Sequence, residues 1–195
     1  MIRTIGLLGL LSVLGSTHAP NLIIQPESRV WVTGKSTVRD FTCTASAVEG
    51  SILTSPNVTA LSLDDLDSAV TAVELRIPIA QLACGNGTMD GHMKKALKAS
   101  AHETIVFRMA GYSTASVAVD TTALELRGIL AMAGAEQPVV LTAAATYESD
   151  GTLRIQGSQA VTMSEWGVKP PSLMLGTMKV RDDVVVHFDI RLRQP

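Results

Sequence analysis

Residues Val184 to Leu192 read Val-Val-Val-His-Phe-Asp-Ile-Arg-Leu and decide the fold class. The even positions of this stretch are all apolar, whereas His187, Asp189 and Arg191 lie between them. Because successive side chains of a β-strand point to opposite faces, the stretch predicts a strand with one apolar and one mostly polar face. The same pattern recurs through most of the chain, so the sequence predicts a sheet that closes around an aliphatic interior.

The other alternating stretches predict an all-β domain. We expect strands at residues 28–34, 38–48, 51–54, 69–79, 104–112, 123–132, 139–148, 152–163 and 178–192. Turns are expected at Glu49-Gly50, at residues 149–151 and within the last strand at residues 182–183. Lys169-Pro170-Pro171 predicts a rigid loop, since proline is excluded from strand interiors. About eight strands with short connections indicate an antiparallel barrel or sandwich.

One segment has the period of a helix. Met89, Met93, Ala96 and Leu97 follow a helical spacing, which predicts one short helix over residues 90–99 with Asp90 as its N-cap.

The N-terminus has the pattern of a secretory signal peptide. Arg3 precedes the apolar run 5–14, which is too short to span a bilayer. We expect a signal peptide over residues 1–19 and one mature domain over residues 20–195. Pro20 favours a different cut near Gly15-Ser16, and an uncleaved anchor is the remaining alternative. No later run reaches the roughly 18 apolar residues of a membrane helix, so we expect no transmembrane segment in the mature chain.

Composition narrows the partners and the interior. The net charge is −2 and there is no basic run, which argues against nucleic acid as a partner. Only 4 % of residues are aromatic, so an interior built from the 46 % hydrophobic residues is mostly aliphatic.

The two cysteines, Cys43 and Cys84, predict a disulfide if the protein is exported. Closing a loop of this length stabilises the fold by roughly 4 kcal/mol in the chain-entropy account. Two buried free thiols and a redox-active pair are the alternatives, although the Cys-x-x-Cys spacing is absent.

Several phrases, taken in order, resemble the YceI-like family of exported lipid-binding β-barrels. They are residues 28–41, Ile77-Pro78-Ile79 with Leu82 and Cys84-Gly85, residues 89–98 before 105–107, residues 126–130, residues 162–171 and residues 176–180. The resemblance implies a lipocalin-like, eight-stranded antiparallel barrel with an elongated apolar cavity. Family members are associated with polyisoprenoids or other long-chain amphiphiles in the bacterial periplasm.

The chain is similar to a branch of this family that carries two cysteines and the pattern Gly-x-Ser-x-x-x-Asp, here Gly34 to Asp40. Much of the family has a histidine-containing stretch where this chain has Gly34-Lys35-Ser36-Thr37. The identity of the ligand therefore does not follow from the resemblance.

These observations predict a periplasmic or secreted bacterial carrier that holds a long-chain lipid, without catalysis or a cofactor. The alternative is a solid barrel that acts through surface contacts with other proteins, and a homodimer is left open. The residues expected to line the ligand cavity are Ile105, Phe107, Met109, Leu126, Leu141, Ala143, Ala145, Tyr147, Ile155, Val186 and Phe188.

Enzymatic interpretations have little support in the sequence. His92, His102 and Cys84 lack the spacing of a metal site. Ser36 and Asp40 are expected to fix a turn rather than to act in a hydrolase triad. His187 is expected to form a surface pair with Asp189, and Trp166 to act as a lid or plug.

Overall fold

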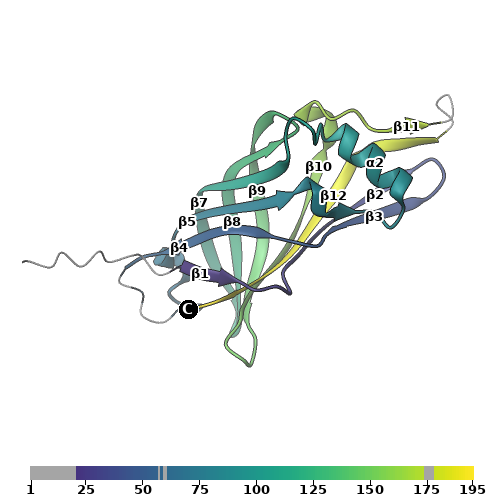
Figure 1. The fold of residues 1–195 in the computed structure, drawn as a ribbon. Helices are drawn as coiled ribbons and strands as arrows, with labels where there is room; N and C mark the ends of the chain where they lie inside the picture. The colour runs from purple at the N-terminus through teal and green to yellow at the C-terminus, as the bar shows by residue number, and fades with distance from the viewer. Residues whose placement is uncertain (1–20, 57, 59–60, 174–177) are drawn as a thin grey trace, which may run out of the picture.

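Eight antiparallel strands close into a barrel in the computed structural model of the protein, which describes residues 21–56, 58, 61–173 and 178–195 (Figure 1). The barrel closes because β1 pairs with β4 on one side and with β12 on the other. In order around the barrel, its strands are β1 (Asn21–Ile24), β4 (Glu49–Thr54), β5 (Val70–Pro78), β7 (Thr104–Ala118), β8 (Thr121–Met132), β9 (Ala135–Tyr147), β10 (Leu153–Thr162) and β12 (Met178–Arg193).

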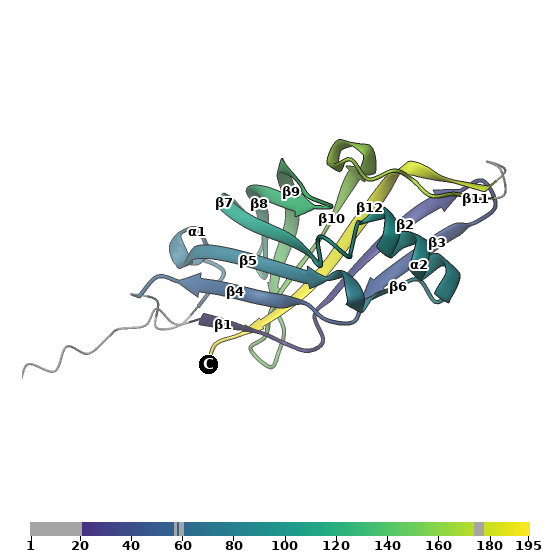
Figure 2. The same ribbon diagram turned by 45° about the horizontal axis from the view of Figure 1, so that its top comes forward.

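The sheet extends beyond the barrel at one end. Strand β12 is long enough to pair with β1 near its C-terminus and with β2 (Arg29–Ser36) along its middle. Strands β3 (Asp40–Ala45) and β6 (Leu82–Ala83) continue the sheet from β2, and β11 (Ser172–Leu173) pairs with the start of β12. Figure 2 shows helix α2 (Gly87–Ala96) lying beside this flared part of the sheet.

Strand structure is interrupted between β1 and β2, so that β1 pairs with β12 in the barrel and β2 pairs with β12 in the flared part of the sheet. The Ser28 hydroxyl accepts a hydrogen bond from Arg191 N (3.0 Å) and donates to Arg191 O (3.3 Å). This side chain thereby takes the place of a strand neighbour where the backbone departs from β12.

The predicted helix exists but begins earlier than expected. Helix α2 starts after Asn86, whose side chain accepts a hydrogen bond from Met89 N at 3.1 Å. Asp90 is therefore not the N-cap; its carboxylate accepts a hydrogen bond from Cys84 N at 2.6 Å and fixes the helix to the preceding segment. The other helical turns of the described residues are short: α1 (Leu66–Ala69), η1 (Ile79–Gln81) and η2 (Met163–Trp166). None of the helices in the described ranges is long and apolar enough to cross a membrane.

Three expectations about the strands are wrong. Strand β1 was not expected, and Glu49-Gly50 begins β4 instead of forming a turn. Strand β4 pairs with β1 and β5. Residues 182–183 continue β12 across a shift in register, because Asp183 accepts a hydrogen bond from Thr162 and Asp182 accepts one from Ser164 N. The loop expected at residues 169–171 lies outside any strand, as predicted.

Buried apolar side chains form two clusters. One includes Leu97, Trp166 and Val168 near α2 and η2, and the other includes Leu22, Ile52 and Leu66 near β1, β4 and α1. The signal peptide expected at residues 1–19 lies outside the described residues.

The outer face of β12 carries polar side chains, but not in the pairing expected. His187 stacks on Trp31 of β2, with ring centroids 5.1 Å apart, and its Nε2 lies 2.9 Å from Thr33 Oγ1. Asp189 instead accepts hydrogen bonds from Arg154 Nε (2.9 Å) and Nη2 (2.6 Å) of neighbouring β10. The cross-strand guanidinium offers a bidentate partner that an imidazole on the same strand cannot match.

The interaction between the Asp189 carboxylate and Arg154 should contribute to the free energy of unfolding in an acid-sensitive way. Its hydrogen bonds and charge interaction with Arg154 hold the pKa of Asp189 below the usual range, although burial opposes this. Because the folded pKa is lowered, the contribution is complete above the unfolded pKa near 4 and is lost as pH falls through the folded pKa. We expect Asp189→Asn to be less stable than wild type at neutral pH, and this difference to shrink below about pH 4.

Urea unfolding at a series of pH values measures this difference. Arg154→Gln should behave like Asp189→Asn, because the two side chains act as a pair. A stability difference that stays constant down to the acid limit of folding would contradict this account.

Candidate functional site

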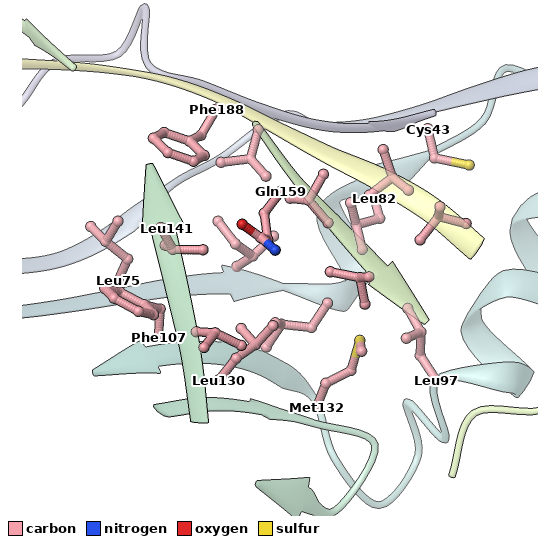
Figure 3. A pocket seen from close by; sticks show the side chains of 18 of the residues that line it. Cys43, Leu75, Leu82, Leu97, Phe107, Leu130, Met132, Leu141, Gln159 and Phe188 are labelled. Carbon is pink, nitrogen blue, oxygen red and sulfur yellow. The ribbon is translucent and has the colours of Figure 1, made fainter. Parts of the chain in front are cut away.

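The interior of the barrel holds a continuous cavity of about 740 Å³. This volume lies within the range of about 300–1,000 Å³ that is typical of small-molecule sites. Alternate residues of the strands line it, and nearly all of them are aliphatic, aromatic or thioether side chains. Figure 3 shows these side chains converging from opposite walls, among them Leu75, Phe107, Leu141 and Phe188.

The cavity is elongated. Its lining on β12 runs from Val180 to Leu192 through the apolar face that identified this strand. A rise of about 3.3 Å per residue makes this path roughly 40 Å long, or roughly 30 Å along the axis of a barrel with typical strand tilt. An extended chain fits such a shape better than a compact ring system does.

Polar side chains gather at one end of the cavity, which we call the mouth. The mouth is formed by the turn between β2 and β3 and by the start of α2, and Val38 at its edge is 63 % exposed. The polar side chains that line it are Ser36, Arg39, Asn86, Thr88 and His92. A hydrocarbon chain can thus lie inside while a polar group stays near water.

Two tyrosines close the opposite end, the floor, by holding the segment 61–70 across it. Tyr112 Oη donates a hydrogen bond to Leu66 O and accepts one from Val70 N at 3.1 Å. Tyr147 Oη donates to Leu61 O at 2.6 Å. Burial raises the pKa of both tyrosines, so both hydroxyls stay protonated and able to donate.

Removing one of these hydroxyls should loosen the floor. We expect Tyr112→Phe to lower the free energy of unfolding by about 1–2 kcal/mol, because it leaves two backbone groups of the segment 61–70 without a partner. Hydrogen exchange should become faster at Val70 N while β10 amides stay protected. Unchanged exchange at Val70 in Tyr112→Phe would mean that the hydroxyl does not hold the floor.

Most residues expected to line the cavity do line it. They are Ile105, Phe107, Met109, Leu126, Leu141, Ile155, Val186 and Phe188. Ala143, Ala145 and Tyr147 are not among the lining residues. Ala143 and Ala145 are buried in the cluster near the floor, and Tyr147 is turned to Leu61 by its hydrogen bond.

Three glycines on the inner face, Gly157, Gly128 and Gly34, do not create the cavity. A Cβ on Gly157 would lie 2.5 Å from the Phe188 ring, so this ring already lies across the glycine. Phe107 covers Gly128 and Phe41 covers Gly34 in the same way. Each ring lies close to the backbone of the neighbouring strand, which leaves the middle of the barrel open.

Sequence reasoning missed the contribution of α2 and η2 to the lining. Met89 and Met93 come from α2, and Met163 begins η2. Methionine is unbranched and flexible, so it adapts to ligands of different shape. The helical spacing of Met89 and Met93 marked an apolar face, but the sequence does not say which wall that face meets.

Cys43 and Cys84 form the predicted disulfide, which excludes the free-thiol alternative in this structure. The bond joins β3 to the segment before α2, so it ties the helix at the mouth to the sheet.

Among the described residues, no group of three or more His, Cys, Asp or Glu side chains is placed to hold a metal ion. Ser36 fixes the turn before β3, since its Oγ donates to Arg39 O at 2.7 Å and accepts from Arg39 N at 3.1 Å. No hydrogen bond or ion pair among the described residues involves the Asp40 side chain. Trp166 is buried near the cavity, where its Nε1 donates to Leu130 O at 2.8 Å.

The closed antiparallel barrel with its elongated apolar interior defines the class of hollow, lipocalin-like β-barrels. Within this class, the chain belongs to the YceI-like family, whose domain matches residues 24–192. Comparison with curated proteins gives no match.

Solved structures share the fold at low sequence identity. BcnA of Burkholderia cenocepacia is 14 % identical, with a TM-score of 0.63 over 85 % of this chain and 96 % of that one. A polyisoprenoid-binding domain from Saccharophagus degradans is 11 % identical, with a TM-score of 0.67 over 91 % of this chain and all of that one. The YCEI protein of Campylobacter jejuni is 16 % identical, with a TM-score of 0.56 over 78 % and 84 % of the two chains.

Proposed function

We propose that this protein is a periplasmic or secreted carrier that holds a long-chain isoprenoid or another amphiphilic lipid in its barrel, without bond chemistry. The observation that carries the proposal is the continuous apolar cavity with polar side chains at one end and a closed floor at the other. A lipid would lie with its tail toward the floor and its polar group at the mouth.

The energetics favour a chain that fills much of the cavity. Each methylene group moved from water into the interior contributes about 0.8 kcal/mol. Several such groups offset the cost of immobilising the ligand, so affinity should rise with chain length until the tail reaches the floor. Met89, Met93 and Met163 can adjust to tails of different branching.

Two further observations support the proposed compartment and ligand class. A disulfide is typical of oxidising compartments and agrees with the signal-peptide pattern of the N-terminus. The Saccharophagus degradans neighbour is described as a polyisoprenoid-binding domain. A cavity of about 740 Å³ favours the carrier over the solid-barrel alternative, which requires an interior filled by side chains.

Native mass spectrometry tests the proposal directly. The full chain, exported and purified without detergent, should carry a hydrophobic adduct that solvent extraction releases. After delipidation, added geranylgeraniol or stearic acid should form a one-to-one complex. A protein that carries no adduct and ignores both compounds would contradict the carrier function.

A further inference from the structure

Among the described residues, Gln159 is the one amide side chain in the middle of the cavity lining. It follows Ile155 on the inward face of β10 and precedes Val161, both of which also line the cavity. Figure 3 shows the Gln159 amide among aliphatic side chains that include Leu82, Leu130 and Leu141. The other polar lining groups either belong to the mouth or, like Tyr112 and the disulfide, are committed to structural bonds.

The depth of Gln159 follows from strand register. It pairs with Val186 of β12, which lies halfway between Val180 and Leu192, the two ends of the cavity lining on that strand. Six residues of strand separate Val186 from each end, or roughly 15 Å along the barrel axis. A group bound by Gln159 would therefore lie near the middle of a ligand that extends from mouth to floor.

The Nε2 group of the Gln159 amide has a hydrogen-bond partner in the protein. Strands β9 and β10 pair from Tyr147–Leu153 to Ala143–Gly157, and no pair joins them beyond that point. Past this point, Gln159 Nε2 donates a hydrogen bond to Ala160 O at 3.1 Å. Because a carbonyl only accepts, the amide group that faces Ala160 O must be the NH₂.

The Oε1 group of the same amide has no hydrogen-bond partner among the described residues. It faces a cavity section that is otherwise apolar. Gln159 is half-buried and its Oε1 remains accessible from the cavity, on a wall where a leucine would present only apolar surface. The structure accounts for the Nε2 group but leaves a hydrogen-bond acceptor available to a ligand.

We infer that Gln159 Oε1 accepts a hydrogen bond from the ligand and that the cavity selects chains with a hydroxyl or N–H group near their middle. This inference rests on the proposed carrier function and specifies its ligand class. A chain that is hydrocarbon throughout leaves Oε1 unpaired. A chain with a mid-length donor satisfies Oε1 and its own polar group in one contact.

Two positional isomers test the inference at constant hydrophobicity. In α-hydroxystearic acid the hydroxyl stays beside the carboxylate at the mouth, whereas in the isomer hydroxylated at carbon twelve it reaches the interior. Isothermal titration or native mass spectrometry on the delipidated full chain gives the ratio of the two dissociation constants. We expect Gln159→Leu to shift this ratio about tenfold against the mid-chain isomer, because the variant buries its hydroxyl without a partner.

A matched control uses the same substitution on the opposite face of β10. Gln156 lies outside, where its Nε2 donates to Asp189 Oδ2 at 3.3 Å, so Gln156→Leu should keep the wild-type ratio. If Gln159→Leu does not fold, Gln159→Met keeps the unbranched shape and serves in its place.

The outcomes separate the two proposals. A ratio that is the same in wild type and in Gln159→Leu, with both acids bound, overturns the role of Gln159 and leaves the carrier function intact. Failure of wild type to bind either acid, stearic acid or geranylgeraniol overturns both.

Discussion

The Leu141→Trp variant is expected to bind long-chain lipids about a hundredfold more weakly than wild type while remaining as stable to denaturant. Leu141 projects from β9 into the cavity (Figure 3), where an indole would occupy space that a tail otherwise fills. Excluding about four methylene groups costs about 3 kcal/mol of binding free energy, which is roughly a hundredfold in Kd.

The expected effect on stability distinguishes a hollow barrel from a packed one. Enlarging a side chain in a filled core usually costs about 1–3 kcal/mol, because neighbours must move. In a cavity of about 740 Å³ the indole finds room and buries more apolar surface, so the urea midpoint should hold or rise.

Val140→Trp is the matched control, since Val140 directly precedes Leu141 in β9, points outward and is 48 % exposed. It should leave both lipid affinity and stability near wild type. Titration with geranylgeraniol and urea unfolding measure the two quantities. A Leu141→Trp variant that loses stability but binds lipid normally would place the ligand outside the barrel.

Removal of the disulfide should have the largest effect on stability. We expect the double variant Cys43→Ala, Cys84→Ala to lose about 4 kcal/mol, because the unfolded chain regains the entropy of a loop between residues 41 positions apart. This is a large share of the roughly 5–15 kcal/mol that stabilises an ordinary domain. With a typical urea dependence, the midpoint should fall by about 2 M.

The same change should loosen the mouth. The disulfide and the hydrogen bond from Cys84 N to Asp90 hold the start of α2 against the sheet, and α2 supplies Met89 and Met93 to the cavity. Lipid should therefore dissociate faster from the double variant. Dithiothreitol serves as the control: it should lower the wild-type midpoint by a similar amount and leave the double variant unchanged. A wild-type midpoint that dithiothreitol does not move would contradict the loop-entropy account.

Much of the cavity wall could be predicted from alternation alone. From Val184 to Leu192 of β12 the apolar residues at even positions all turned inward, because a strand in a closed sheet has only two faces and one must avoid water. The same rule correctly placed Ile105, Phe107 and Met109 of β7. Alternation failed for Ala143 and Ala145, because facing inward does not distinguish a residue that lines empty space from one covered by its neighbours.

Residue-type patterns predicted the helix N-cap and the turn in the last strand less reliably, because contacts with other elements decide both. Asp90 suits an N-cap by residue type, yet Asn86 takes that role and leaves Asp90 to bond Cys84 N. Asp182 and Asp183 suit a turn, yet hydrogen bonds from Ser164 and Thr162 keep them within β12. In each case the deciding partner comes from another element of the chain.

The sequence by itself determined the all-β class and the inward face of each long strand, and it predicted the disulfide that the structure confirms. These follow from the two-residue period of a strand and from an even cysteine count, which are local or compositional properties. Only the tertiary structure decided that the interior is hollow, that two tyrosines close its floor and that the Gln159 amide faces its middle. Volume and depth depend on how several strands lie across from one another, and no single strand carries that information in its own sequence.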